Sequence, residues 1–306
     1  MKAHSILTDK HIVVLYGGPG AEREVSIRSG QSVANALQSL GLSVVPVEMK
    51  NPPPNLPDAV DLVVNMIHGT YGEDGDLQRD LDRLGIPYTG EGEKGSRLAF
   101  DKIESKRAFD RAGISTPAWE IVRKGETTSF EPPFVVKAPR QGSSVGVHII
   151  RNVPDYPAAV ADCLRFGEEV LIEKFIEGRE LTVGVLGSEA LPVIEIHPKK
   201  GFYTYENKYT KGATEYLVPA PIDEETTQRV LQIALRAHQA LGLEIYSRVD
   251  VLLDAQGALH VLEINTIPGM TETSLLPKAA ASRGMGFPEL CAHIALLSLE
   301  RSVRQE

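Results

Sequence analysis

Two apolar runs near the end of the chain decide the fold: YSRVDVLLD (Tyr246–Asp254) and ALHVLEINTIPGM (Ala258–Met270). Both are rich in Val, Ile and Leu and only a short segment separates them, so we expect two strands of a hairpin. Polar side chains interrupt these runs at Asp250, Glu263 and Asn265. Because side chains alternate between the faces of a strand, Glu263 and Asn265 share one face, and a paired Asp250 can point the same way.

Two carboxylates and one amide oxygen on one face suit magnesium, which completes its shell with water and nucleotide phosphates. Arg248 precedes Asp250 by two positions, so we expect it on the same face. The alternative is that these are ordinary polar residues on the solvent side of a half-buried sheet. The turn after Asn265 favours the metal, because it leads to a helix start at Ser274 and Leu275, and a helix N-terminus beside a metal forms an anion site.

The composition is that of an ordinary globular protein, with 306 residues, 42% hydrophobic and 24% charged, which predicts two or three domains. A net charge of −9 without a basic run argues against nucleic acid as a partner. Cys163 and Cys291 have no metal-binding spacing, so we expect reduced thiols. The sequence lacks a signal-peptide core and an apolar run of membrane-spanning length, so we expect a cytoplasmic protein without a membrane partner.

The N-terminal part has the pattern of an open parallel α/β sheet. We expect strands over residues 11–16, 44–49 and 62–67 and a helix over 29–40. The glycine-rich GGPGAEREVS fits neither the dinucleotide-binding nor the Walker pattern. The third strand runs into HGTYGEDG, which begins at His68 and lies where open α/β sheets place their ligands. His68 is there either a substrate contact or an ordinary loop residue.

A change of composition near residue 100 marks a domain boundary, followed by a charged helix expected over 101–112 with Lys102 in its first turn. Lys137 lies inside the apolar strand 133–139, and buried lysines are rare unless they meet an anion. The small residues of RQGSSVG that follow form a loop able to close over phosphates. The alternative is a surface hairpin whose lysine extends to solvent.

Three further segments complete the pattern. The apolar strand from Val170 ends in an acid-rich turn at Glu180, and an apolar slot flanked by backbone groups and acids fits a purine with its ribose. Residues 201–212 contain aromatic residues without periodicity, bounded by glycines, which is typical of an active-site loop. Amphipathic helices are expected over 223–241 and 287–301.

Several blocks, in order along nearly the whole chain, resemble those of the D-alanine:D-alanine ligases of the ATP-grasp superfamily: GGPGAEREVS, HGTYGEDG, VVKAPRQGSSVG, LIEKFIEGRE, YENKY, RVDVLLD and LEINTIPGMTETSLLP. Their joint occurrence is highly specific. The resemblance implies an α/β, three-domain ATP-grasp fold, with residues 1–100 forming a substrate-binding domain, and 101–181 and 182–306 gripping ATP. It also implies ATP-dependent joining of two D-alanines through an acyl phosphate, for peptidoglycan precursor synthesis.

The same resemblance assigns the residues that hold ATP and metal. Those that meet the phosphates are Lys102, Lys137 and Lys208. Those that surround the adenosine are Glu173, Lys174, Phe175, Ile176, Glu180, Phe202, Leu252 and Leu262. Two Mg²⁺ ions, which Mn²⁺ can replace, are held by Asp250, Glu263 and Asn265, in agreement with the oxygen-donor argument above.

The two amino-acid substrates are placed by resemblance as well. Glu22 takes the ammonium group of the first D-alanine, and Val25 and His68 line its pocket. Ser274 and the N–H of Leu275 bind the carboxylate of the second D-alanine.

The remaining implied residues act on the reaction itself. Arg248 and the Gly269 N–H stabilise the oxyanion of the tetrahedral intermediate, where preorganised donors contribute most. Ser143 and Tyr209 are linked to Glu22 by hydrogen bonds and close the loops over the intermediate. This closure keeps water away from the acyl phosphate.

Two alternatives stay open at this point. A related ligase could join D-alanine to D-lactate or D-serine, although Tyr209 argues against D-lactate, because depsipeptide-forming relatives replace this tyrosine. A nucleotide-binding regulator without catalysis would be expected to lose Arg248 or a metal ligand, and all are present. Phe175 stands where some relatives carry Trp, which leaves the adenine affinity open. We also expect a homodimer.

Overall fold

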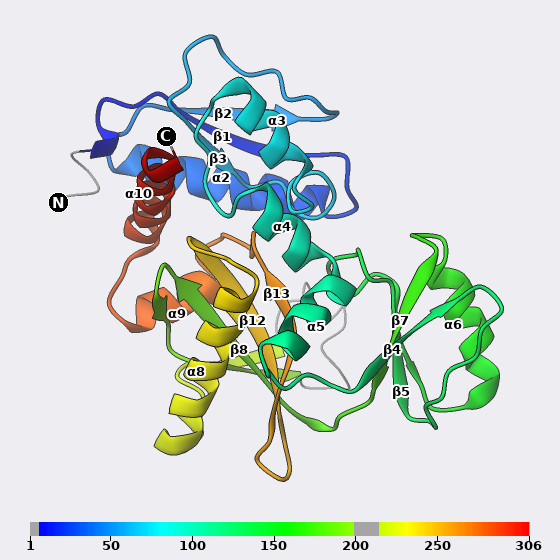
Figure 1. Cartoon of the computed structure of the whole chain (residues 1–306). Coiled ribbons are helices and arrows are strands. Elements are labelled where there is room, and N and C mark those ends of the chain that lie inside the picture. The colour runs from blue at the N-terminus through cyan, green and yellow to red at the C-terminus, as the bar shows by residue number, and fades with distance from the viewer. Residues whose placement is uncertain (1–5, 199–213, 306) are drawn as a thin grey trace.

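The computed structural model describes residues 6–198 and 214–305, which form three β-sheets with flanking helices. Figure 1 shows the sheet of the central part of the chain, within residues 119–174, and α6 (Tyr156–Cys163) standing to one side. The helices α4 (Glu93–Phe100) and α5 (Lys102–Arg111) lead to it from the N-terminal sheet. Within the described ranges, no helix combines the length and apolar character needed to span a membrane. The three sheets frame the space in which the candidate site lies.

The N-terminal sheet is parallel, in the order β2-β1-β3, which confirms the expected open parallel arrangement. The central strand β1 is buried along its whole length. The elements of this part are β1 (Ile12–Gly17), α2 (Arg23–Ser39), β2 (Val44–Met49), β3 (Leu62–Asn65), α3 (Asp76–Leu84) and α4 (Glu93–Phe100). The loops that follow β1 and β3 therefore leave the same edge of the sheet.

Two boundaries in this sheet differ from the expected ones. Helix α2 begins at Arg23, earlier than residue 29, and the Ser26 N–H closes its first turn by donating to Glu22 O at 3.0 Å. The hydroxyl of Ser26 accepts from Gly17 N at 2.7 Å and donates to Met66 O at 2.6 Å. Strand β3 ends at Asn65, short of residue 67. The Asn65 side chain accepts from the N–H of Ile67 at 2.9 Å, which turns the chain into the loop that carries His68.

The central sheet is antiparallel, in the order β4-β7-β5-β6. Asp101 caps α5 by accepting from the N–H groups of Ile103 at 3.0 Å and Glu104 at 3.3 Å, which confirms Lys102 in the first turn. The elements are α5 (Lys102–Arg111), β4 (Trp119–Arg123), β5 (Phe134–Lys137), β6 (Val147–Ile150), η1 (Val153–Asp155), α6 (Tyr156–Cys163) and β7 (Glu169–Lys174). Lys137 thus ends a strand that is paired on both sides.

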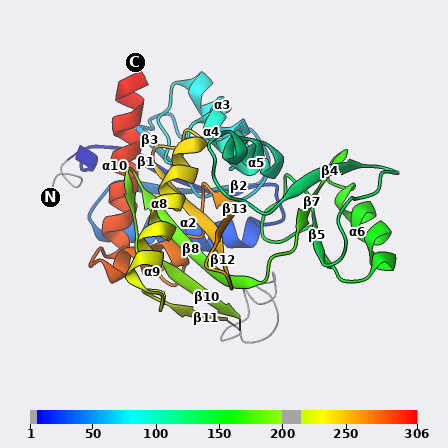
Figure 2. The same ribbon diagram turned by 60° about the horizontal axis from the view of Figure 1, so that its bottom comes forward.

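The third sheet has the order β11-β10-β8-β12-β13, with β9 on β8 (Figure 2). Strands β12 and β13 form the expected hairpin, in which Asp250 pairs directly with Glu263 and Arg248 with Asn265. The elements are β8 (Gly178–Leu186), β9 (Glu189–Ala190), β10 (Ile194–Pro198), β11 (Thr214–Leu217), α8 (Glu224–Ala240), β12 (Tyr246–Asp254), β13 (Leu259–Asn265), α9 (Leu275–Ser282) and α10 (Phe287–Gln305). The helices expected over 223–241 and from 287 are confirmed.

Helices join the sheets into one body. Leu290 and Ile294 of α10 lie in the same buried apolar cluster as Val33 and Leu37 of α2, so the end of the chain packs against its beginning. Phe109 of α5 belongs to the core under the C-terminal sheet. Burial of these apolar side chains stabilises the arrangement that holds the loops of the N-terminal sheet opposite β12 and β13.

Candidate active site

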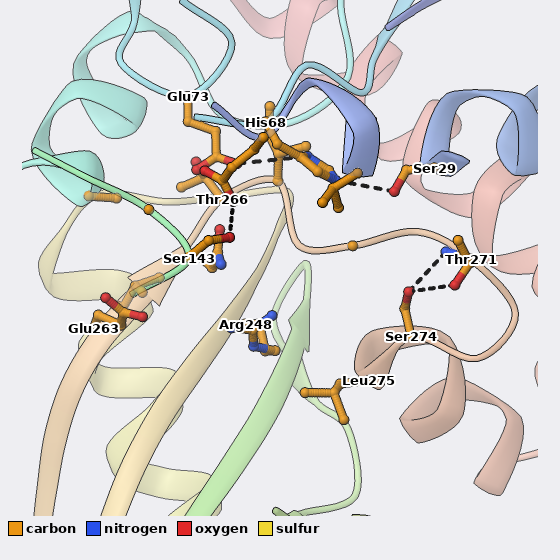
Figure 3. A pocket seen from close by; sticks show the side chains of 18 of the residues that line it. Ser29, His68, Glu73, Ser143, Arg248, Glu263, Thr266, Thr271, Ser274 and Leu275 are labelled. Atoms are coloured by element: carbon orange, nitrogen blue, oxygen red, sulfur yellow. Dashed lines mark hydrogen bonds and ion pairs between the residues drawn. The ribbon is translucent and has the colours of Figure 1, made fainter. Parts of the chain in front are cut away.

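A cavity of about 600 Å³ lies where the three parts of the chain meet. Figure 3 shows part of its lining, with His68 and Glu73 at the top, Arg248 below them and Ser274 at the lower right. The expected site residues that line it are Glu22, Val25, His68, Lys102, Ser143, Arg248, Glu263, Asn265, Gly269, Ser274 and Leu275. Residues far apart in sequence are therefore collected around one space.

A loop from the central part reaches over Glu22. Ser143 donates a short hydrogen bond to the Glu22 carboxylate, which confirms the expected contact between these two residues. Ser143 and Ser144 both have positive φ angles, of 49° and 63°, a conformation that costs residues other than glycine about 1–2 kcal/mol. At Gly142 a Cβ atom would collide with Oε2 of Glu22, so a side chain there would displace the carboxylate that Ser143 contacts.

His68 is a buried, neutral side chain beside Glu22's end of the cavity. Its Nε2 lies 3.1 Å from the hydroxyl of Ser29. Burial, and to a lesser degree the Arg248 guanidinium, lowers the pKa of His68 to about 4, so the imidazole carries no charge at pH 7. A neutral ring can line an ammonium pocket without repelling the ammonium group.

Glu73 is a site residue that the sequence analysis did not single out. It is buried, lines the cavity, and has an oxygen 3.8 Å from Nδ1 of His68. Burial, together with the nearby Glu22 carboxylate, raises the pKa of Glu73 well above its usual range. The signal in the sequence was its position in the same glycine-rich loop as His68.

Arg248 and Asp250 form a bidentate ion pair on the half-buried, cavity-lining side of β12. The Nε of Arg248 lies 3.0 Å from Oδ1 of Asp250, and its Nη2 lies 2.8 Å from Oδ2. Thr182 on β8 donates a further hydrogen bond of 2.6 Å to Oδ1 of Asp250. The structure confirms that Arg248 lies on the same face as Asp250, and the Asp250 carboxylate fixes the orientation of the guanidinium group.

The oxygen donors expected for magnesium face one another across β12 and β13. Asp250 and Glu263 are directly paired and Asn265 follows by two positions, so their chemistry fits a hard divalent cation. Glu263 forms an ion pair with Nζ of Lys102 at 3.1 Å, so the carboxylates of Asp250 and Glu263 both have cationic partners. The described residues contain no cluster of three His, Cys, Asp or Glu side chains arranged for a metal, and a site here needs the Asn265 amide and outside oxygens.

A β-bulge lies among the residues expected around adenosine and metal. The register of β12 and β13 shifts after Asp250, so that Leu262 is the extra residue of β13. Leu262 and Glu263 are both half-buried, whereas the flanking Val261 and Ile264 are buried. Consecutive residues on one face break the alternation of a regular strand, and the bulge brings an apolar and an acidic side chain to the same surface.

Other residues expected around adenosine come from adjacent strands. Glu180 on β8 is paired with Leu252 on β12, next to the bulge on β13. Phe175, beyond the end of β7, packs its ring under the guanidinium of Arg151 at 5.5 Å. Lys174 is exposed at the end of β7, and Ile176 is half-buried in the connection from β7 to β8.

Lys137 meets Glu173 rather than solvent. Its Nζ lies 2.6 Å from one carboxylate oxygen of Glu173, and the other oxygen lies 2.7 Å from Nζ of Lys106. Burial would raise the pKa of Glu173, but the two lysines outweigh it and hold this pKa at about 2. The sequence analysis did not single out Lys106. The signal was its spacing of three residues from both Ile103 and Phe109, which places all three on the buried face of α5.

At the other side of the cavity, α9 begins directly after Ser274, as expected. The Ser274 hydroxyl lies 3.0 Å from the N–H of Thr271 and 2.8 Å from its hydroxyl, and within the described residues no side chain caps α9. The first N–H groups of the helix, including that of Leu275, therefore point to an open anion position. A Cβ atom at Gly269 would lie 3.2 Å from the Ser274 hydroxyl, so glycine suits this approach.

Three expected site residues, Phe202, Lys208 and Tyr209, lie outside the described residues. Their assignments to adenine, phosphate and loop closure stay predictions. The expected loop over 201–212 lies outside them too. Both cysteines, Cys163 and Cys291, are free and buried, as expected.

Comparison with known proteins identifies the class and the family. A family model described as "D-ala D-ala ligase C-terminus" matches residues 107–295. The chain is 46% identical over 292 residues to the D-alanine–D-alanine ligase of Methylacidiphilum infernorum, covering 95% of this chain and 96% of that protein. It is 43% identical to the corresponding ligase of Aquifex aeolicus, covering 92% and 99%.

Solved structures agree with the sequence relatives. The crystal structure of the Bacillus anthracis D-alanine–D-alanine ligase complexed with ATP superposes with a TM-score of 0.83 at 30% identity, covering 97% of this chain and all of that one. A second structure of the Bacillus anthracis ligase gives a TM-score of 0.85 at 33% identity. The fold and the site thus define an ATP-grasp enzyme, a carbon–nitrogen ligase by class. Within that class, the chain belongs to the D-alanine–D-alanine ligase family.

Proposed function

We propose that this chain joins two molecules of D-alanine into D-alanyl-D-alanine, converting ATP into ADP and phosphate, in the synthesis of peptidoglycan precursors. The observation that carries the proposal is that one cavity is lined by the Glu22 carboxylate, by Arg248 and by the start of α9 at Ser274 and Leu275. An ammonium group fits the carboxylate of Glu22, and a carboxylate fits the start of the helix. The sequence relatives are named for D-alanine, so D-lactate and D-serine are not favoured as acceptors.

The nucleotide in this proposal binds between the central and C-terminal sheets. Lys137 at the end of β5 and Lys102 at the start of α5 supply positive charge for the phosphates. Leu252 and Leu262 supply an apolar surface for the adenine, and Glu180 on the neighbouring strand suits the ribose hydroxyls. The ATP complex of the Bacillus anthracis relative supports this choice of cosubstrate.

Glu22 binds the ammonium group of the first D-alanine, so that the carboxylate of this D-alanine faces the phosphates. One oxygen of the D-alanine carboxylate attacks the γ-phosphorus of ATP, and ADP leaves, which produces the acyl phosphate. The amine of the second D-alanine, held by its carboxylate at Ser274 and Leu275, then attacks the acyl carbon. The oxyanion that forms receives the Arg248 guanidinium and the Gly269 N–H, and phosphate leaves as the peptide bond closes.

The metal part of the proposal rests on donor chemistry. Asp250, Glu263 and Asn265 would hold two Mg²⁺ ions, with Mn²⁺ as a substitute, next to the phosphates. Bound there, such ions neutralise phosphate charge and orient it for transfer. Lys102 and Arg248, which now contact the two carboxylates, would then be free to turn toward substrate oxygens.

Three organisational features belong to the same proposal. The functional division is substrate binding by residues 1–100, with ATP gripped by 101–181 and 182–306. The protein acts in the cytoplasm, where ATP is available, and assembles as a homodimer. Light scattering after size exclusion measures the assembly state directly, and a monomeric mass would contradict the homodimer.

One experiment tests the function. Phosphate release is measured with ATP and Mg²⁺ against a panel of D- and L-amino acids, and the products are analysed by mass spectrometry. We expect release only with D-alanine, together with formation of the dipeptide. Release that is independent of any amino acid, or a product other than D-alanyl-D-alanine, would contradict the proposal.

A further inference from the structure

Lys106 is a buried charged residue to which none of the preceding steps assigns a role. Its side chain is fully buried, with an exposed fraction of 1%, on the inner face of α5. Its Nζ lies 2.7 Å from Oε1 of Glu173 and donates to the hydroxyl of Thr116 at 2.5 Å. A lysine removed from water at this cost requires partners, and these two groups supply them.

The charges of Lys106, Lys137 and Glu173 do not sum to zero. Glu173 contacts Lys106 with one oxygen and Lys137 with the other. Burial lowers the pKa of Lys106, whereas the Glu173 carboxylate at 2.7 Å favours its charged form. With Lys106 charged, the directly bonded cluster has two positive charges and one negative charge. Glu173 stays ionised at neutral pH because its pKa is held at about 2. The shared carboxylate therefore neutralises the ammonium group of Lys137 only in part.

The position of Lys106 is also tied to the strand that carries the expected metal ligand. Thr116 donates from its hydroxyl to the backbone oxygen of Val261 at 2.8 Å, and Val261 N donates to Ser115 O at 2.8 Å. Val261 precedes Glu263 by two positions on β13. A chain of polar contacts thus connects Lys137 in the central sheet to the hairpin of the C-terminal sheet.

We propose that Lys106 is a positioning residue for the phosphates of the nucleotide: by sharing the Glu173 carboxylate, it leaves the Lys137 ammonium group with charge for an anion and holds it in place. The inference rests on the proposed binding of ATP between the two sheets. The ligand class is a nucleoside di- or triphosphate, and the effect acts on its phosphates rather than on its base.

The test separates phosphate recognition from general loss of structure. Affinities for ADP and for adenosine are measured by calorimetry for the wild type and for Lys106→Met, which keeps the length of the side chain and removes its charge. Because the remaining Glu173–Lys137 pair is neutral, we expect ADP to bind about tenfold more weakly and adenosine within about twofold of the wild type. Lys106→Arg, which keeps the charge, should recover part of the ADP affinity.

The control is Arg107→Met, since Arg107 is the exposed neighbour on the same helix. It should change neither affinity. Equal weakening of adenosine and ADP in Lys106→Met would assign Lys106 a structural role, and unchanged ADP affinity would also overturn the inference. A wild type that binds no ADP would contradict the proposed function instead.

A second variant covers the case in which Lys106→Met does not fold. Thr116→Val keeps both lysines and removes the hydroxyl that holds Lys106 against Val261. Because about one hydrogen bond is lost, we expect the affinity for ADP to fall about threefold and the affinity for adenosine to stay unchanged. Wild-type ADP affinity in this variant would overturn the positioning role.

Discussion

His238 offers a clean test of how burial controls a charge away from the active site. It lies on α8, is 2% exposed, and has Nδ1 at 2.8 Å from the hydroxyl of Ser247. Within the described residues its Nε2 has no hydrogen-bond partner. Burial lowers the pKa of His238 from 6.5 to about 4, so the folded protein holds this ring in its neutral form.

The sign of the pH effect follows from proton linkage. Between pH 6.5 and pH 4 the unfolded chain binds a proton at this residue and the folded chain does not, so acid favours unfolding. Taking these two pKa values, lowering the pH from 8 to 5 should cost about 2 kcal/mol of unfolding free energy through His238 alone. The buried carboxyl groups of Glu73 and Glu91, whose pKa values burial raises, contribute with the opposite sign in this range, so comparison with a variant is needed to isolate the His238 contribution.

The perturbation is His238→Asn, which places an amide near the position of Nδ1 and can keep the contact to Ser247. The smaller side chain leaves a cavity, whose cost does not depend on pH. We expect the variant to lose about 2 kcal/mol less than the wild type between pH 8 and pH 5. His68 titrates in both proteins, so its contribution cancels in this difference.

Two measurements check this prediction. Urea unfolding followed by circular dichroism at both pH values gives the free energies, and proton NMR follows the His238 ring directly, with the variant identifying its signal. Parallel pH dependences for the two proteins, or a His238 signal that titrates near pH 6.5, would refute the reasoning from burial.

Three further predictions concern the site. Glu263→Gln removes charge at both proposed metals, so D-alanine-dependent phosphate release should be abolished, and wild-type release at low Mg²⁺ would contradict the metal assignment. Arg248→Ala should lower kcat about a hundredfold with little change in ATP affinity by calorimetry, and an equal loss of ATP binding would make it a nucleotide ligand. Tyr209→Phe should gain D-alanine:D-lactate ester formation at about pH 6, where the amine acceptor is protonated and a hydroxyl acceptor brings no positive charge. If mass spectrometry detects no ester, Tyr209 does not govern the choice of acceptor.

Local patterns in the sequence determined much of this protein. Alternation along β12 and β13 and the short turn between them predicted the hairpin and the face that carries Arg248, Asp250, Glu263 and Asn265, whereas the structure supplied the direct pairing of Asp250 with Glu263. Lys137 was predicted as an anion ligand because a lysine within an apolar run needs a partner. These features depend on neighbouring residues, whose backbone geometry repeats with a fixed period.

Only the tertiary structure decided which charged groups from distant parts of the sequence form ion pairs. Glu173 fell within a strand that was expected to face adenosine, and nothing in that segment indicates that Lys106 and Lys137 bind its two oxygens. Glu73 likewise became a site residue only once the fold placed it, buried, near Glu22. The physical reason is that desolvation and charge pairing depend on which side chains packing brings together, and strand or helix periodicity carries no information about partners that lie elsewhere in the chain.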